Sequence, residues 1–301
     1  MKVIVTHASP DWDAITSVWL LRRFLPNWNN AKVQFVPAGD RISPLKENQT
    51  DPIEHVGNDE VIHVDTGLGP LDHHQIASDK VCGASRTWDY VKEKHQEFLS
   101  PNERATIKME AIDRIVGYVV ELDHFKEVFW EDASADRHEF GLYGLLEGVK
   151  LQKPNEDEFY ILFGSECLDA EVHNFENRIW AEHEIQEKGI VFETACGKAL
   201  GIETVNDATI KLAQKMGYNI VIRKDPRKGY VRIKTLPVRD GEKKKIDLTL
   251  TKEKLAKMDP DATWFLHVSK RMLLNGTPKN PKMVPTKLSL EQIISVVKEV
   301  A

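Results

Sequence analysis

The chain has 301 residues, of which 41% are hydrophobic and 29% charged, and its formal net charge is −6. This length allows two domains that each bury a core, and the composition excludes a disordered or repeat-built chain. No apolar run reaches 18 residues, and the first residues follow a strand pattern and lack the features of a signal peptide, so we expect no membrane association and a cytoplasmic location. The three cysteines, Cys82, Cys167 and Cys196, predict neither a disulfide framework nor a cysteine zinc site, which favours a reducing compartment.

The first half of the chain follows the pattern of an α/β domain. Residues 2–7 (KVIVTH) predict a buried strand, and residues 13–25 predict a helix with apolar residues at helical spacing. Residues 32–39 and 60–67 predict two further strands, and helical patterns then dominate for about a hundred residues. We therefore expect a parallel-sheet domain with a helical second half over residues 1–187.

The pattern changes near residue 188. Residues 189–205 predict a hairpin, residues 206–217 a capped helix, and residues 218–225 and 229–237 two strands. A last helix is predicted over residues 288–301. The second domain, residues 188–301, is therefore expected to be a smaller α+β domain.

The stretch HASPDWDA, residues 7–14, places three possible metal ligands directly after the first strand. In the simplest interpretation, Ser9 is the N-cap of the following helix, Pro10 lies in its first turn, and Asp11 and Asp13 favour the positive end of the helix dipole. In the functional interpretation, the imidazole of His7 and the two carboxylates face one cleft. Such oxygen and nitrogen ligands suit magnesium, manganese, cobalt or iron.

A second cluster follows the third predicted strand. Asp65 ends that strand, and Asp72, His73 and His74 come seven to nine residues later in a loop with two glycines and a proline. Because neighbouring strands of an α/β sheet end at the same edge, both clusters are expected in one crevice. Together they supply enough ligands for two metal ions, which can stabilise an in-line displacement at phosphorus.

The motifs HASPDWDA, VDTG and LDHHQ resemble the first three motifs of the DHH phosphoesterase superfamily. That superfamily includes family II inorganic pyrophosphatases, the exonuclease RecJ, oligoribonucleases and cyclic-dinucleotide phosphodiesterases. Its fourth motif is an aspartate after an apolar helix, for which DRIVGYVVELDHF offers Asp123. The loop VDTGLGPLDHHQ is most similar to a DHH-type nuclease family labelled metal-dependent protein hydrolase, although the first motif and the missing glycine pair near the carboxyl terminus depart from that family.

The resemblance implies a role for each of these residues. It implies two divalent ions, most naturally Mn²⁺ with Co²⁺ or Mg²⁺ as alternatives, bridged by Asp65. One ion would be bound by His7, Asp11 and Asp65, and the other by Asp13, Asp65, His73 and Asp123. His74 would lie beside the substrate phosphate as a donor or acid, and Asp72 would orient a histidine through its free ring nitrogen.

Residues 222–257 carry thirteen Lys or Arg against five Asp or Glu. The segment RKDPRKGYVRIKT combines this charge with an aromatic ring, which suits a phosphate backbone with a stacked base, although a solvated surface hairpin explains it equally well. A glycine turn near the carboxyl terminus is a second candidate contact, and a purely structural turn is its alternative. The expected substrate-binding residues are Arg223, Arg227, Lys228, His267, Arg271 and Asn275.

We therefore expect a manganese-dependent phosphohydrolase that cleaves phosphodiester bonds of nucleic acid or oligonucleotides with a metal-activated hydroxide. An inorganic pyrophosphatase or other small-phosphate hydrolase is one alternative, and a non-catalytic nucleotide or nucleic-acid binding module is another. Nucleic acid or a nucleotide is the expected partner, and a homo-oligomer is possible. The sequence does not distinguish RNA, DNA, dinucleotide and small-phosphate substrates.

Overall fold

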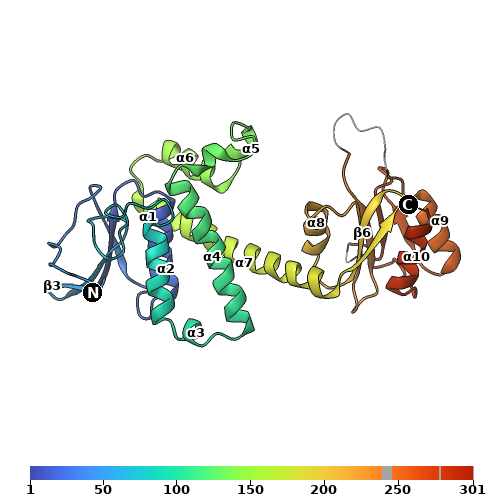
Figure 1. The fold of residues 1–301 in the computed structure, drawn as a ribbon, viewed down its shortest axis with the longest axis horizontal. Coiled ribbons are helices and arrows are strands. Elements are labelled where there is room, and N and C mark those ends of the chain that lie inside the picture. The colour runs from blue at the N-terminus through green and yellow to red at the C-terminus, as the bar shows by residue number, and fades with distance from the viewer. Residues whose placement is uncertain (239–245, 278, 301) are drawn as a thin grey trace. The chain divides into compact units, whose positions relative to one another are not determined.

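The computed structural model describes residues 1–238, 246–277 and 279–300, and the chain divides into two compact units, Met1–Glu176 and Asn177–Ala301 (Figure 1). The division falls inside one long helix, α7 (Asp157–Lys188), whereas the predicted domain boundary at 187/188 lies at the carboxyl end of that helix. None of the helices in the described part of the chain is long and apolar enough to cross a membrane. The predicted α/β class is confirmed, with parallel strands in the first unit and a mixed α+β arrangement in the second.

Unit 1 begins with a four-stranded sheet of order β2-β1-β4-β3. The central strand β1 pairs in parallel with β2 on one side and with β4 on the other, while β3 runs antiparallel to β4 and was not predicted. The strands of this sheet are β1 (Lys2–His7), β2 (Lys32–Val36), β3 (Glu54–Val56) and β4 (Asp59–His63).

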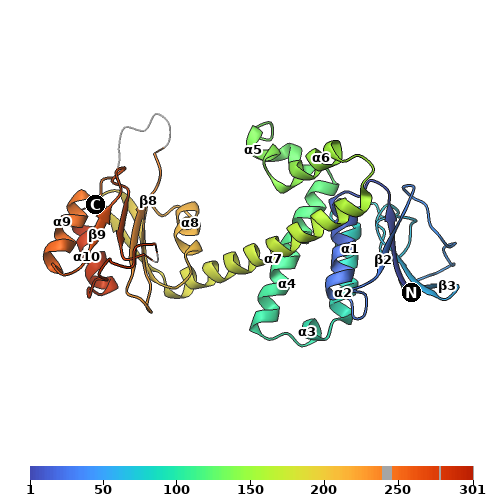
Figure 2. The ribbon, with the colours of Figure 1, turned by 180° about the vertical axis from the view of Figure 1, so that it is seen from behind.

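Helices make up the rest of unit 1, as predicted, but they are more numerous than the sequence patterns indicated (Figures 1 and 2). The segment between residues 126 and 152 folds into three short helices that were not predicted, and α7 begins 17 residues before the helical pattern recognised at residue 174. These elements are α1 (Trp12–Phe24), α2 (Gly83–Lys94), α3 (Gln96–Leu99), α4 (Glu103–Asp123), η1 (Lys126–Phe129), α5 (Asp136–Glu139), α6 (Leu142–Gln152) and α7.

Helix α1 is the centre of the unit 1 core. The periodicity predicted one apolar face, but every residue from Trp12 to Leu21 is buried. The reason is that α1 contacts α2 and α4, while its Trp19 indole donates a hydrogen bond of 2.9 Å to Asp169 of α7. A helix surrounded in this way is buried on all sides.

Unit 2 contains a six-stranded sheet of order β5-β6-β7-β8-β10-β9, in which β6 and β7 are parallel and the other pairs antiparallel. Besides the end of α7, three helices in the described part of this unit accompany the sheet, and the second of these three was not predicted. The elements are β5 (Ile190–Thr194), β6 (Gly197–Glu203), α8 (Ala208–Lys215), β7 (Ile220–Lys224), β8 (Val231–Thr235), α9 (Thr249–Met258), β9 (Trp264–Leu266), β10 (Met272–Asn275) and α10 (Leu290–Val300).

We predict that Leu20→Ala destabilises unit 1 by about 2–5 kcal/mol, because Leu20 in α1 is fully buried and its removal leaves a cavity. Leu99→Ala is the matched control, since the Leu99 side chain in α3 is 54% exposed. Urea denaturation followed by circular dichroism measures both variants. Equal midpoints for Leu20→Ala and Leu99→Ala would contradict the central position of α1.

Candidate metal centre

The candidate site lies where strands β1 and β4 end. These strands are parallel and in register, with Val5 opposite His63, so their carboxyl ends meet at one edge of the sheet. His7 is the last residue of β1 and Asp65 follows β4 by two residues, and the ring Nε2 of His7 lies 3.2 Å from Asp65 Oδ2. The structure thus brings the two sequence clusters together.

His7, Asp11 and Asp65 form the first group of possible ligands, with one ligand atom from each within 4.8 Å of the others. The Nδ1 of His7 donates a hydrogen bond of 2.9 Å to the carbonyl of Ala8, so Nε2 is the nitrogen that faces the carboxylates. Burial by itself would lower the pKa of His7, but the hydrogen bond with Asp65 and the charge of Asp11 raise it to about 9. The ring is therefore oriented as a metal-ligating histidine is, with its other nitrogen held by a carbonyl.

Asp11 also begins helix α1. Its Oδ1 accepts the backbone N–H groups of Asp13, at 2.9 Å, and Ala14, at 3.1 Å, so Asp11 is the N-cap. The alternative in which Ser9 caps the helix is wrong, because Ser9 has a left-handed backbone with φ of 54° and lies two residues before the cap. Capping uses Oδ1 of Asp11, while the Asp11 side chain remains 53% exposed at the edge of the site.

The second group surrounds the imidazole Nε2 of His73. This atom lies 3.6 Å from Asp13 Oδ2, 3.5 Å from Asp65 Oδ1 and 3.6 Å from Asp123 Oδ2. Three of these atoms, His73 Nε2, Asp65 Oδ1 and Asp123 Oδ2, are buried and have no hydrogen-bond partner among the described residues. Buried polar atoms normally have partners, so three unpartnered atoms in one place need a common explanation.

A divalent cation fits this group. Two ligand atoms that each lie about 2.1 Å from one octahedral ion are about 3 Å apart when they are adjacent and about 4 Å apart when they are opposite. The distances of 3.5 to 3.6 Å from His73 Nε2 to the three carboxylate oxygens fall between these two values. The donors are carboxylates and imidazoles, the set that suits manganese and its neighbours. The residues present therefore suit a divalent cation at this position.

The charges of the site also favour cations. Burial, together with the charges of Asp65, Asp11 and Asp123, raises the pKa of Asp13 well above its ordinary value. Burial likewise raises the pKa of Asp123, with the charges of Asp65 and Asp11 adding to the effect and His73 offsetting part of it. Burial would raise the pKa of Asp65 too, but the hydrogen bond with His7 and the nearby imidazole of His73 lower it overall. Carboxylates that cannot all ionise together are the usual environment of a bound cation.

The amino terminus of α2 packs against the same carboxylates. The N–H of Gly83 donates to Asp13 Oδ2 at 2.6 Å, and the N–H of Ala84 donates to Asp13 Oδ1 at 2.5 Å. A Cβ atom on Gly83 would lie 3.0 Å from both Asp13 Oδ2 and Asp65 Cβ, and 3.2 Å from Asp65 Cα. Glycine therefore permits this close approach. The sequence analysis missed Gly83, although a glycine at the start of a helical pattern is the signal that could have identified it.

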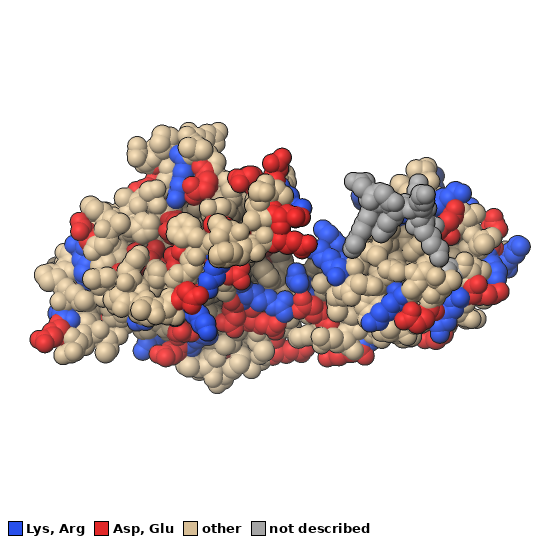
Figure 3. Space-filling model, turned by 45° about the horizontal axis from the view of Figure 1, so that its top comes forward, with Lys and Arg blue, Asp and Glu red and all other residues tan. Residues whose placement is uncertain are grey.

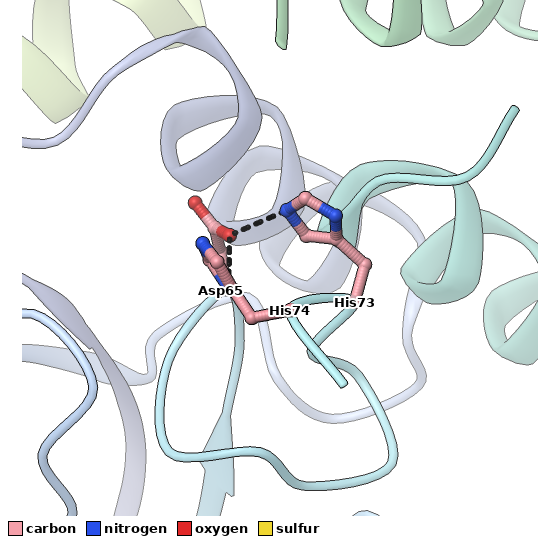
Figure 4. Close-up of side chains that lie close together, drawn as sticks. All are labelled: Asp65, His73 and His74. Atoms are coloured by element: carbon pink, nitrogen blue, oxygen red, sulfur yellow. Dashed lines mark ion pairs between the residues drawn. The ribbon is translucent and has the colours of Figure 1, made fainter. Parts of the chain in front are cut away.

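Asp72 and His74 are joined by hydrogen bonds. Asp72 is buried, and its Oδ1 accepts hydrogen bonds from the N–H of His74 at 3.1 Å and from the His74 Nδ1 at 2.6 Å. In Figure 4 both His73 and His74 approach the same oxygen of Asp65, and His74 Nδ1 is 3.9 Å from Asp65 Oδ1. Because Asp72 holds Nδ1, the other nitrogen of the exposed His74 ring is free to meet a ligand.

His124 is a second residue that the sequence analysis missed. Its Nε2 lies 3.5 Å from Asp123 Oδ2, and the two residues form a possible ligand group with His73. The same nitrogen donates a hydrogen bond of 3.0 Å to the carbonyl of Val81, so the backbone at residue 81 holds the His124 ring beside Asp123. Its position next to Asp123 in the sequence was the available signal.

The predicted substrate-binding residues of unit 2 separate into two groups. Arg223, Arg227 and Lys228 line a cavity of about 170 Å³ together with Tyr230, Arg232 and Gly276. Within it, Arg223 is buried, pairs with Asp207 at 3.0 Å and with Asp225 at 3.6 Å, and keeps an Nε without a partner among the described residues. Figure 3 shows basic and acidic side chains interspersed on unit 2. Part of the basic segment, residues 239–245, lies outside the described residues.

His267, Arg271 and Asn275 lie around strand β10, with Arg271 directly before it and Asn275 at its end. Arg271 pairs with the Thr235 end of β8, whereas Asn275 lies opposite Val231 at the other end of that strand. His267 Nδ1 is hydrogen-bonded to Ser269 Oγ at 2.8 Å, and Arg271 donates to the carbonyl of Leu236 at 2.8 Å.

Asn275 is fully buried, and backbone groups occupy both ends of its side chain. The amide nitrogen donates to the carbonyls of Thr263 and Val284, and the oxygen accepts from the N–H of Thr286. In this conformation Asn275 offers no group to a ligand. Asn275 therefore stabilises a turn, which is the structural alternative given for the glycine turn in the sequence analysis.

No family model matches the chain, and no curated protein matches it. Several solved structures match the chain. One is the DHH domain of a protein described as a member of the s1p family of ribosomal proteins. It is 10% identical, the match covers 99% of this chain and 86% of that chain, and the TM-score is 0.32. A pGpG-specific phosphodiesterase from Vibrio cholerae matches at 14% identity, with 98% of each chain covered and a TM-score of 0.27. RecJ from Thermus thermophilus in complex with Mn²⁺ matches at 11% identity, with 99% of this chain and 51% of that chain covered and a TM-score of 0.27. TM-scores this low carry no argument about function. The function proposed below is therefore argued from the side chains of the site.

We predict that Gly83→Ala weakens Mn²⁺ binding by about tenfold or more while the fold is retained, because the added methyl group displaces Asp13 and Asp65. The matched control is Gly117→Ala in helix α4, where a Cβ meets nothing within 4 Å. Titration calorimetry with Mn²⁺ and circular dichroism would measure binding and folding. Unchanged affinity in Gly83→Ala would show that the contact of α2 with the carboxylates does not matter for the ion.

Proposed function

We propose that the chain is a metal-dependent phosphohydrolase of the DHH phosphoesterase type, and that it cleaves phosphodiester bonds of nucleic acid or oligonucleotides. The observation that supports this most strongly is the convergence of Asp65 Oδ1, His73 Nε2 and Asp123 Oδ2, which are buried and unpartnered within the described residues. These atoms belong to three separate motifs of the superfamily resemblance, and Asp123 is supplied by helix α4, far from the loop that carries the other two. Agreement between motif and geometry favours catalysis over the alternative of a binding module with missing ligands.

The residues would hold two divalent ions that share Asp65. His7, Asp11 and Asp65 would bind one ion, and Asp13, Asp65, His73 and Asp123 would bind the other, because the two oxygens of Asp65 face different histidines. Mn²⁺ is the proposed metal, with Co²⁺ and Mg²⁺ as alternatives. When bound, such a pair of ions supplies Lewis acidity toward a phosphoryl group and activates water at neutral pH.

His74 and Asp72 are the proposed groups for the substrate phosphate. Asp72 accepts the Nδ1 proton of His74, which fixes the tautomer and orientation of the ring. The exposed His74 can then donate a proton or a hydrogen bond to a phosphate oxygen through its other nitrogen once the ring is protonated. Asp72 acts through His74 and is a positioning residue.

Unit 2 would bind nucleic acid through a basic cavity of its own. The cavity is lined by four cations, Arg223, Arg227, Lys228 and Arg232, and by Tyr230, whose ring lies 5.8 Å from Lys228 Nζ; Asp207 and Asp225 also line it. The buried Nε of Arg223, unpartnered within the described part of the chain, is a donor that a phosphate oxygen could accept from. Basic groups beside an aromatic ring suit a nucleotide better than pyrophosphate, and this favours an oligonucleotide substrate.

We predict that Asp65→Asn lowers phosphodiester turnover by more than about 100-fold, because the change removes the carboxylate charge that both ligand groups share. The measurement compares short RNA, short DNA, linear and cyclic dinucleotides and pyrophosphate in the presence of Mn²⁺, Co²⁺ or Mg²⁺. A suitable control is Asp59→Asn, since Asp59 lies at the amino end of β4, away from this edge, and pairs with the amino group of Met1. Activity that survives Asp65→Asn would remove the shared carboxylate from the proposal, and faster cleavage of pyrophosphate than of RNA would favour the pyrophosphatase alternative.

The basic cavity leads to a separate prediction. Arg227→Ala combined with Lys228→Ala should raise KM for an oligonucleotide roughly 3- to 10-fold and reduce the salt dependence of binding, by a slope of about 0.7 for each lost phosphate contact. The control pair, Lys211→Ala with Lys215→Ala on α8, removes the same charge from exposed positions of unit 2 outside the cavity. Equal effects of the two pairs would indicate that overall charge, and not the cavity, binds the substrate.

A further inference from the structure

A second cavity of about 260 Å³ lies in unit 1 beside the candidate metal centre. Helices α1, α4, α6 and α7, which can be followed in Figure 2, supply its walls. Trp12 lies between the candidate ligands Asp11 and Asp13, and Leu122 lies next to Asp123. Two wall residues are therefore sequence neighbours of candidate ligands, which places the cavity next to the metal centre along α1 and α4.

Four aromatic side chains line the cavity, namely Trp12, Tyr118, Tyr143 and Phe175. Aromatic walls suit a flat ring that can stack on them, and a cavity of this size accommodates one such ring system and not a whole nucleotide. The shape of the cavity therefore selects a planar aromatic group.

Polar groups at the walls narrow the chemistry further. Glu171 lines the cavity, and the indole Nε1 of Trp12 is a buried donor without a hydrogen-bond partner among the described residues. Burial, followed by the charges of Glu121, Glu127 and Glu171, raises the pKa of Tyr118, which places carboxylate charge beside this tyrosine. The carboxylate of Glu171 would repel an acidic ligand and accept N–H groups, while the indole would donate to a ring acceptor.

We propose that this cavity binds the nucleobase of a nucleotide whose phosphate lies at the metal centre. Nucleobases are flat, stack on aromatic rings, and carry N–H donors and ring acceptors on their edges. A simple apolar ligand would leave the buried Trp12 Nε1 without a partner, which argues against it. The proposal rests on the proposed function and extends it, because it assigns base recognition to unit 1.

The test uses nucleosides without metal, so that it does not depend on catalysis. Each of the seven tryptophans gives one indole N–H signal in a nitrogen-15 NMR spectrum, and loss of one signal in Trp12→Phe identifies that of Trp12. Guanosine and adenosine are expected to shift the Trp12 signal at millimolar concentration, and the smaller cytidine and uridine should shift it less. Ribose 5-phosphate, which lacks a base, should leave it unchanged.

Two variants test the walls. Leu142→Trp should fill the cavity and weaken nucleoside binding at least tenfold, whereas Leu145→Trp, on the same helix but 49% exposed and outside the cavity, should not. Glu171→Gln should weaken binding severalfold, and Glu166→Gln, an exposed position of α7, serves as its control.

The outcomes separate this proposal from the proposed function. If no nucleoside shifts the Trp12 signal, or if Leu142→Trp and Leu145→Trp bind equally, the cavity does not bind a base, even if RNA is cleaved. If nucleosides bind as expected but no substrate is turned over with any metal, the base site stands and the phosphohydrolase proposal fails.

Discussion

The candidate site depends on one carboxylate that two groups of ligands share. Oδ2 of Asp65 lies 3.2 Å from His7, and Oδ1 lies 3.5 Å from His73. This arrangement requires parallel pairing of β1 with β4, because only then do His7 and Asp65 leave the sheet at the same edge. Asp65 has a left-handed backbone with φ of 49°, and its N–H donates to the carbonyl of Leu71, so the chain turns there and returns with the two histidines.

The neighbouring structure supports this concentration of negative charge. The first turn of α2 donates two N–H groups to Asp13, and Gly83 leaves room for the approach. Arg41 holds the loop after Asp65 by donating to the carbonyl of Gly67 at 3.1 Å, and it pairs with the buried Glu54. The chain thus fixes the ligands through its own contacts, which is the preorganisation that a metal centre requires.

Much of unit 1 could be predicted because its signals are local. The buried strand 2–7 and the spacing of Asp65, Asp72 and His73 identified the sheet edge and the loop that returns to it. Gly83 and His124 were missed because their roles depend on contacts with distant segments, which no local pattern reports. Asn275 was predicted to bind substrate, because a polar residue beside a glycine turn can either contact a ligand or stabilise the turn. Its hydrogen bonds to backbone groups show the second role, and the sequence does not reveal those partners.

The shared carboxylate is tested most directly by diffraction from crystals of the chain grown with Mn²⁺, with anomalous scattering used to locate the ions. The account predicts two peaks about 3.5 to 4 Å apart on either side of Asp65, one within bonding distance of His7 and the other within bonding distance of His73. Ions bound elsewhere, or a single ion that does not contact Asp65, would contradict it.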